Sequence, residues 1–164
     1  MAEPDPDFVA SIRRYYRSLD AHRYDRLRSA LHPAFVQYRP DKTLEGRDRF
    51  ISFMRDDRPV PDTEHRLAAW FRPMAASDLA LGPGDEPTPP SGEGALDFGT
   101  GEDGENPDTD RSARGPSQLA IRGEVRRPDG PPLLAFVDVH GRSSPSDPRI
   151  RTIHTYAGDP DGGE

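Results

Sequence analysis

One stretch of the chain, residues 35–54 (FVQYRPDKTLEGRDRFISFM), constrains the fold more than any other. Residues 34–38 favour a strand because they are rich in aromatic and β-branched side chains. The polar run at 39–42 is typical of a turn. From Gly46 onward, Phe50, Ile51 and Met54 form an apolar stripe that predicts a helix. A strand followed by an amphipathic helix needs further helices and strands to bury both apolar sides.

Two helices are predicted before this stretch. The first opens at Asp5-Pro6, where Asp5 can cap the helix and Pro6 suits its first position. Its apolar residues recur at spacings of three and four, at positions 8, 12, 15, 16 and 19. Three arginines at 13, 14 and 17 occupy the other side, which we interpret as a solvated face. A second helix is predicted from about Tyr24 to Leu31, with Pro33 stopping it.

The rest of the chain has strand patterning. Strands are predicted at 63–71, 118–126, 133–141 and 150–156, with hairpin turns between the last three and a further short strand at 79–81. Three helices followed by four or five antiparallel strands predict an α+β fold, a sheet covered by helices on one face.

Residues 82–116 differ from the rest of the chain. They hold eight glycines, six prolines and nine acids, with Leu96 and Phe98 as the only large apolar residues. Such a segment buries too little apolar surface to offset its ordering entropy. We therefore predict a single domain over 1–164 with a disordered acidic Gly/Pro-rich insertion at 82–116.

Composition excludes several classes of protein. The chain has no cysteine, so a disulfide framework, a thiolate metal site and a thiol nucleophile are excluded. No apolar run reaches the roughly 18 residues that a membrane span needs. The N-terminus has no apolar core of a secretion signal, so we expect a soluble, cytoplasmic protein without a membrane partner. The net charge of −7 disfavours nucleic acid as a partner, and the acid excess with Lys42 as the only lysine favours a salt-adapted, halophilic source.

The pattern of the first half resembles a known family. The segment IRRYYRSLDAHRYDRLRSALHPAFVQYRPDKTLEGRDRFISFM is similar to the opening of the NTF2-like superfamily, which includes SnoaL-like polyketide cyclases and ketosteroid isomerases. The closing segment FVDVHGRSSPSDPRIRTIHTYAG resembles the last hairpin of that family. The resemblance implies a cone-shaped NTF2-like fold, with three N-terminal helices on a curved antiparallel sheet of four to six strands. It also implies a homodimer packed through the sheets.

The resemblance also suggests site residues. Asp138 falls at the position of the isomerases' oxyanion-hole aspartate, and Tyr15 falls at that of their tyrosine. Asp138 stands out by itself as well, because burial within an apolar strand would raise its pKa and let the neutral acid donate a hydrogen bond. The alternative is that Asp138 pairs with an arginine of the sheet, such as Arg122, Arg126 or Arg151. The isomerases' proton-shuttling aspartate corresponds to about Tyr38, which is no general base at neutral pH.

Histidines are the other acid–base candidates. Strand alternation places Phe136, Asp138 and His140 on one face, so His140 can act as an acid or base there. His65 begins the strand after the third helix and is a second candidate. For both, a structural role is the competing interpretation. His154 is predicted to face outward, towards a dimer partner.

Aromatic side chains suggest the ligand. We predict that Tyr16, Tyr38, Trp70 and Phe136 bind a small apolar, ring-bearing molecule. A metal site formed by His65, His140 and Asp138 is an alternative, but no spacing typical of a metal site supports it. The sequence also has no P-loop, dinucleotide or nucleophile-elbow motif, so no metal or cofactor is expected. Two functions stay open: a SnoaL-like pocket enzyme that performs cofactor-free isomerisation or cyclisation, and a non-catalytic NTF2-like module for ligand binding or dimerisation.

Overall fold

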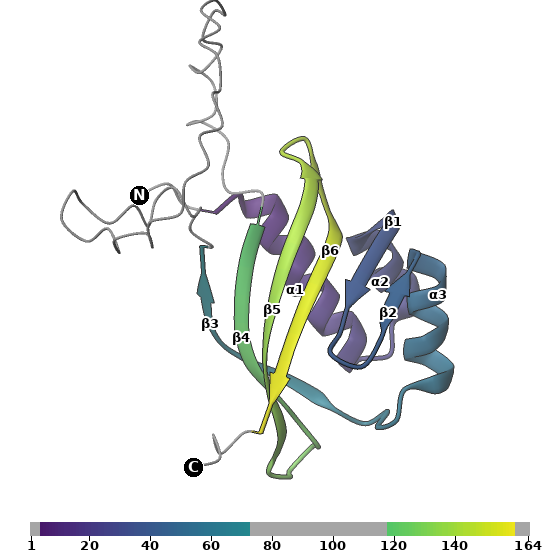
Figure 1. Ribbon diagram of the computed structural model, residues 1–164, viewed down its shortest axis with the longest axis vertical. Coiled ribbons are helices and arrows are strands. Elements are labelled where there is room, and N and C mark those ends of the chain that lie inside the picture. Colours follow the sequence, from purple (N-terminus) through teal and green to yellow (C-terminus); the bar gives the residue numbers. More distant parts are fainter. Residues whose placement is uncertain (1–3, 73–117, 160–164) are drawn as a thin grey trace, which may run out of the picture. The chain divides into compact units, whose positions relative to one another are not determined.

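The computed structural model of the protein describes residues 4–72 and 118–159. Within them the helices lie against one face of a curved six-stranded sheet, with α1 running across it (Figure 1). The elements are α1 (Pro6–Asp20), α2 (Tyr24–Ala30), β1 (Leu31–Tyr38), β2 (Thr43–Glu45), α3 (Arg47–Ser52), the π-helical turn η1 (Phe53–Asp57), β3 (Glu64–Phe71), β4 (Gln118–Arg126), β5 (Pro132–Ser144) and β6 (Asp147–Gly158). The predicted α+β class is confirmed.

The sheet differs from the prediction in one pairing. Its strand order is β2-β1-β6-β5-β4-β3. Four pairings are antiparallel, as expected, but β1 runs parallel to β6, so the sheet is mixed. The parallel pairing arises because the chain returns from the far side of the sheet and places its last strand beside its first.

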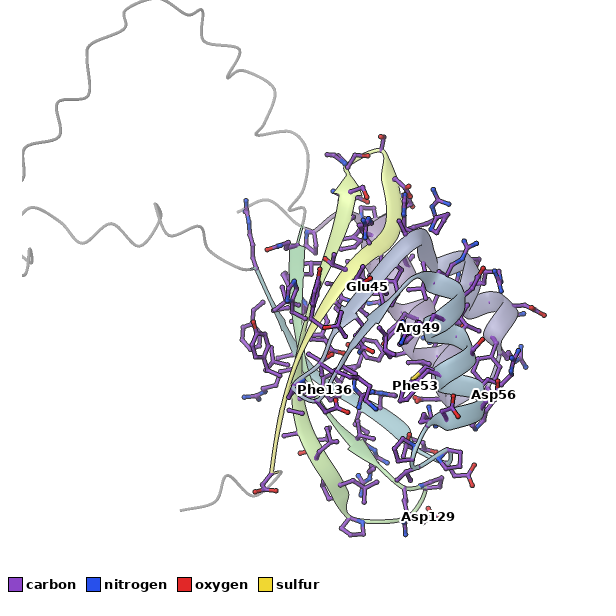
Figure 2. The ribbon with its side chains drawn as sticks, turned by 45° about the vertical axis from the view of Figure 1, so that its right-hand side comes forward. Glu45, Arg49, Phe53, Asp56, Asp129 and Phe136 are labelled. Carbon is purple, nitrogen blue, oxygen red and sulfur yellow. The ribbon has the colours of Figure 1, made fainter. Side chains whose placement is uncertain are left out.

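The central stretch contains a strand that the sequence pattern does not predict. Residues 43–45 form β2, which pairs with residues 36–38 of β1, so the polar turn at 39–42 closes a hairpin. Gly46 then starts α3 with a φ of 90°, a backbone conformation that glycine adopts without a steric cost. A second hairpin joins β4 to β5, with Asp129 at its tip (Figure 2).

The first helix begins where the sequence predicts. The Asp5 carboxylate accepts hydrogen bonds from the backbone N–H groups of Asp7 and Phe8, and Pro6 occupies the first turn. The apolar face of α1 packs into a core shared with α2, α3 and the sheet. Its fully buried large side chains include Phe8, Leu19, Leu27, Leu31, Phe35, Phe50, Leu119, Ile150 and Ile153.

The two faces of the sheet have different roles. Residues directly opposite each other on neighbouring strands share a face, so the register defines both faces. The inner face, towards the helices, carries Ile121, Asp138 and Thr155 in one row. The outer face carries Phe71, Val139 and His154 by the same register. The expected outward direction of His154 is confirmed; its expected dimer partner stays a prediction.

The acidic insertion predicted at 82–116 and the short strand predicted at 79–81 lie outside the described residues. Among the residues that are described, none of the helices combines the length and the apolar character that crossing a membrane requires.

Candidate active site

Tyr16 of α1 lies at the centre of a buried polar cluster on the inner face. Its hydroxyl oxygen is 2.8 Å from Oδ2 of Asp138 and 2.8 Å from Nε2 of His140, both on β5. All three side chains are buried. Helix periodicity turns Tyr16 towards the sheet, and strand alternation brings Asp138 and His140 to the same side of β5. The cluster therefore forms where the inward-facing side of α1 meets the inward-facing residues of β5.

The second oxygen of Asp138 is also bonded. Thr155 of β6 donates to its Oδ1 at 2.7 Å, and Nε2 of Gln37 donates to the Thr155 hydroxyl at 3.1 Å. The alternative was that Asp138 pairs with Arg122, Arg126 or Arg151. It is wrong for Arg126 and Arg151, because both donate to backbone carbonyl groups instead. Arg126 donates to the carbonyl of Gly130, and Arg151 donates to a carbonyl on β1.

The third candidate, Arg122, lies opposite Val137 and Ala69 in the register, on the outer face. Because Ile121 and not Arg122 lies opposite Asp138, the Arg122 side chain projects from the other side of the sheet.

A hydroxyl group has one proton, and this fixes the tautomer of His140. When Asp138 is ionised, the Tyr16 hydroxyl donates its one hydrogen bond to Asp138, so Nε2 of His140 must carry a proton and donate to the Tyr16 oxygen. The Nδ1 atom of His140 is then a bare acceptor, and it is buried with no hydrogen-bond partner among the described residues.

Burial sets the charge of this cluster. Desolvation raises the pKa of Asp138, and the hydrogen bonds from Thr155 and Tyr16 oppose that rise. Desolvation lowers the pKa of His140 to about 3, so this imidazole stays neutral at physiological pH. Desolvation and the neighbouring Asp138 raise the pKa of Tyr16, which stays protonated. The cluster is thus built from neutral donors around one carboxyl group.

A histidine–carboxylate pair lies beside the cluster. Nδ1 of His65 on β3 is 2.6 Å from Oδ1 of Asp20, the last residue of α1, and the backbone N–H of His65 donates to Oδ2 at 3.0 Å. A carboxylate only accepts hydrogen bonds, so Nδ1 carries a proton, and in the neutral imidazole the lone pair then lies on Nε2. The His65 ring lies 5.2 Å from the Tyr16 ring and 5.8 Å from the Phe136 ring, between ring centroids.

The structure brings together most of the predicted site residues. Asp138, His140, His65, Tyr16 and Phe136 form one neighbourhood on the inner face. Their catalytic and ligand-binding roles stay predictions.

Tyr15 requires a correction, because the hydrogen bond to Asp138 is made by the next residue, Tyr16. The Tyr15 ring instead packs edge-on against His140 and stacks on Phe50. The shift is one position along α1, a rotation of about 100° about the helix axis, which a diffuse resemblance does not resolve.

Tyr38 also lies elsewhere than predicted. Its ring stacks on His154 at 4.5 Å between centroids, on the outer face, and it is 41% exposed. The neighbouring Gln37 is the β1 residue that turns inward and joins the Asp138 network. Tyr38 is therefore no part of the inner-face cluster.

Trp70 lies at the open side of the inner face. It lies opposite Ile121, which lies opposite Asp138, so the three side chains share a face. Leu67 lies opposite Gly123 in the next inner row. Both apolar side chains are half exposed, Trp70 at 55% and Leu67 at 43%. An apolar edge thus continues the inner face beyond His65.

Asp20, Thr155 and Gln37 are contacts that the sequence reasoning missed. The sequence pattern identifies Asp20 only as the break after the first helix, and its separation of 45 residues from His65 hides the pair. Thr155 was detectable in principle, because alternation from buried Ile153 places it on the inner face. Among the described residues, no group of three His, Asp or Glu side chains is arranged to hold a metal ion.

Comparison with known proteins supplies the family. The model of the SnoaL-like domain matches residues 12–94, just over half of the 164-residue chain. The chain belongs to the SnoaL-like family. The matched region includes Tyr16, Asp20 and His65, while Asp138, His140 and Thr155 lie beyond it. No protein of curated function matches this SnoaL-like chain.

Solved structures agree with this assignment at the level of the fold. An NTF2-like protein of unknown function from Cytophaga hutchinsonii has a TM-score of 0.55 at 10% identity, over 96% of this chain and 93% of its own. A candidate isomerase of the SnoaL-like family from Agrobacterium tumefaciens has a TM-score of 0.56 at 13% identity, over 94% and 99%. An LEH-like epoxide hydrolase from M. tuberculosis has a TM-score of 0.56 at 12% identity, over 93% and 83%. The predicted NTF2-like fold is confirmed.

Proposed function

We propose that this SnoaL-like protein is a cofactor-free acid–base enzyme that moves a proton on the carbon next to a carbonyl group of a small apolar ring compound. One observation carries the proposal: an imidazole held by a carboxylate lies beside a tyrosine whose hydroxyl is bonded to a buried carboxyl group. A base and a hydrogen-bond donor in one neighbourhood are the two groups that enolisation requires.

His65 is the proposed base. Its Nδ1–H is committed to Asp20, which fixes the tautomer and the orientation of the ring and leaves the Nε2 lone pair for a substrate proton. The carboxylate also favours the imidazolium that forms after the proton is taken. The His65 side chain is 13% exposed, so the base is shielded yet reachable from the open side of the inner face.

Tyr16 is the proposed donor to the developing oxyanion, with Asp138 controlling its proton. When Asp138 is protonated on Oδ2, that group and Nε2–H of His140 both donate to the Tyr16 oxygen. The Tyr16 proton is then free for a substrate oxygen, and the two incoming hydrogen bonds strengthen it as a donor. The Thr155 hydroxyl bond to Oδ1 favours placing the Asp138 proton on Oδ2.

The apolar edge of the inner face favours an apolar substrate. The Phe136 ring contacts both the His65 and the Tyr16 ring, and Leu67 and Trp70 continue this apolar surface towards solvent. Aromatic and aliphatic walls around a few placed polar groups are typical of sites for small ring-bearing molecules.

The proposal is tested by hydrogen–deuterium exchange of small cyclic ketones and enones in D₂O, followed by ¹H NMR. The wild-type protein is expected to accelerate loss of the α-hydrogen signal of at least one compound. His65→Gln is expected to lower that acceleration about 10²- to 10⁴-fold and leave a measurable rate, while keeping the fold, which a CD spectrum checks. If the wild type binds such compounds without exchange, the non-catalytic binding module is the better description.

Replacing Asp138 by Asn tests the proposed proton arrangement. An asparagine amide can accept from Thr155 through Oδ1 and donate permanently to Tyr16 through Nδ2, as the protonated acid does. The wild-type exchange rate is expected to fall as pH rises through the raised pKa of Asp138, because the ionised carboxylate accepts the Tyr16 hydrogen bond that the substrate oxygen needs. Asp138→Asn should keep the low-pH rate and lose this alkaline decline in a pH–rate profile. An unchanged decline would exclude Asp138 as its source.

We also propose that a second copy of the chain covers the outer face of the sheet. The aromatic residues Tyr38, Phe71 and Tyr156 lie there and are 41%, 48% and 62% exposed. Large exposed aromatic side chains gathered on one face are typical of protein interfaces. Analytical ultracentrifugation should find a dimer for the wild type and a monomer for Tyr156→Glu. Leu67→Glu, at a 43% exposed side chain on the inner face, is the control and should stay dimeric. A monomeric wild type would overturn the proposal.

A further inference from the structure

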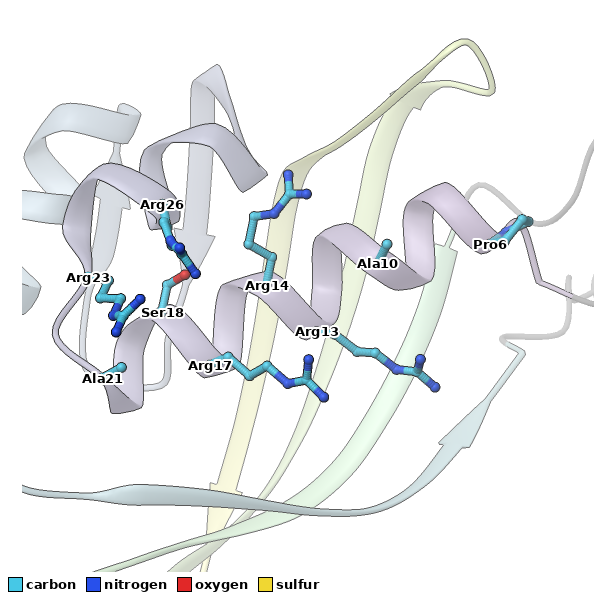
Figure 3. A pocket seen from close by; sticks show the side chains of 9 residues that line it. All are labelled: Pro6, Ala10, Arg13, Arg14, Arg17, Ser18, Ala21, Arg23 and Arg26. Carbon is cyan, nitrogen blue, oxygen red and sulfur yellow. The ribbon is translucent and has the colours of Figure 1, made fainter.

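The outer side of α1 and the start of α2 form an arginine-lined groove. Its hollow has a volume of about 710 Å³, and Figure 3 shows the side chains around it. We call it the arginine groove; it is lined by Pro6, Ala10, Arg13, Arg14, Arg17, Ser18, Ala21, Arg23 and Arg26. Figure 3 shows Arg23 and Arg26 gathered around the Ser18 end of the helix, while Arg13 and Arg17 project together from its middle.

The charges of this groove are not balanced locally. The chain has 29 acids against 22 basic residues, yet no acid lines the groove. Within residues 4–72 and 118–159, none of its five arginines makes a side-chain ion pair. Other arginines are paired, as Arg28 is with Asp48, Arg55 with Asp56 and Arg149 with Asp147.

A solvated helix face accounts for the exposure of Arg13, Arg14 and Arg17, but it does not explain why unpaired arginines from two helices surround one hollow. In an acidic chain, arginines without partners are not expected to gather around one hollow by chance. Like charges held close together repel, and an anion in the hollow would relieve that repulsion. Two helices contribute to the cluster, because Arg26 lies on α2 and Arg23 directly precedes that helix as its N-cap residue.

We propose that the arginine groove binds an extended acidic segment of a partner protein through its carboxylates. Guanidinium groups pair with carboxylates in a planar, bidentate geometry, which suits several arginines in a row. From Pro6 to Ala21 the groove follows α1 for roughly 22 Å at about 1.5 Å per residue. That length accommodates about six or seven residues of extended peptide at about 3.3 Å each.

The lining favours a peptide over a nucleic acid. Proteins that bind single-stranded nucleic acids combine basic grooves with aromatic side chains on which bases stack. The groove has no aromatic lining residue, and its uncharged lining residues are Pro6, Ala10, Ser18 and Ala21. The net charge of −7 also opposes a long polyanion that extends past the groove. This site lies on the solvent side of α1, away from the inner-face cluster, so it is independent of the proposed catalysis.

The test uses a fluorescein-labelled octaglutamate peptide, the full-length chain and fluorescence anisotropy at low salt. The wild type is expected to bind it, with an affinity that falls as NaCl is added. The double variant Arg13→Gln/Arg17→Gln should bind about five- to tenfold more weakly, because each exposed ion pair contributes modestly. The double variant Arg23→Gln/Arg26→Gln should weaken binding by a similar factor. It tests the same groove independently if the first variant folds poorly.

The matched control is Arg55→Gln/Arg149→Gln, which removes the same charge from two exposed arginines outside the groove. It should change the affinity by less than about twofold, since screening weakens distant charges. Absence of octaglutamate binding, or an equal loss in the control, would overturn the proposal. Tighter binding of an oligothymidylate of matched length, or of inorganic triphosphate, would also overturn it and assign the groove to phosphate ligands.

Discussion

Asp20→Asn is expected to slow the enzyme-catalysed exchange of α-hydrogens about 10²- to 10⁴-fold, the range that a positioned general base contributes. Asp20 touches no substrate in this scheme and acts as a positioning residue for His65. Its Oδ1 accepts from Nδ1 of His65 at 2.6 Å, and its Oδ2 accepts from the backbone N–H of the same residue. An asparagine keeps the shape, but it lacks the charge that favours the imidazolium and can present an N–H group to Nδ1, which stabilises the wrong tautomer.

A double-variant cycle distinguishes this role from a structural one. If Asp20 acts only through His65, Asp20→Asn combined with His65→Gln should be no slower than His65→Gln alone. Asp62→Asn is the control, because this exposed carboxylate lies near the other histidine of the region, His22, at 3.8 Å. It should leave the exchange rate within about threefold of the wild type, as expected for a weak surface pair. Additive losses in the double variant would contradict the positioning role.

His140 is expected to make the protein sensitive to acid. The folded protein lowers the pKa of His140 to about 3, whereas an unfolded chain has a histidine pKa near 6.5. Between these values the unfolded state binds a proton that the folded state does not, so stability falls as pH falls. The loss is about 1.4 kcal/mol per pH unit below about pH 6.5, and it amounts to about 2 kcal/mol at pH 5.

The Asp138 carboxyl group has the opposite effect, since its pKa is raised in the folded state. As pH falls through that pKa the folded state takes up a proton first, and this stabilises the fold. The pH dependence of the wild-type unfolding free energy therefore contains opposing contributions from His140 and Asp138, and it shows only their difference. Substituting His140 separates them, because the Asp138 contribution is largely common to both proteins.

His140→Gln is the variant of choice, because the glutamine amide can still donate to Tyr16. Urea denaturation at pH 7 and pH 5 should show that the variant loses about 2 kcal/mol less of its unfolding free energy than the wild type between these values. His22→Gln is the control and should follow the wild type, because this side chain is 42% exposed and lies outside the inner-face cluster. Equal losses in all three proteins would mean that His140 is protonated in the fold.

The fold was predictable because it rests on local patterns. Helix α1 begins at the Asp5 cap, and the strands β3 and β4 begin within one residue of their predicted starts. What the pattern could not supply was the order of the strands. The parallel pairing of β1 with β6 joins residues more than 110 positions apart, and nothing in either strand's own sequence specifies that neighbour.

Strand and helix periodicity predicted which site residues share a face. It could not predict which of two buried side chains makes a given hydrogen bond, or which distant residues the path of the chain brings together. Alternation along β5 is sufficient to predict that Asp138 and His140 share a face, and both side chains contact Tyr16 there. Tyr15 and Tyr16 are both buried on α1, so burial alone does not say which hydroxyl reaches Asp138. Asp20 ends the helix, and only the three-dimensional path of β3 past that end pairs it with His65.

The most direct test of the proposed site is a long-range ¹H–¹⁵N NMR spectrum of the histidine side chains at about pH 8.5. The proposed site requires opposite neutral tautomers in two neighbouring histidines: His65 protonated at Nδ1 with a free Nε2, and His140 protonated at Nε2. The ¹⁵N shifts distinguish these forms without any substrate. Finding that pattern would support His65 as a base directed at the inner face. A proton on Nε2 of His65 with Nδ1 bare would contradict it, because the lone pair would then face Asp20.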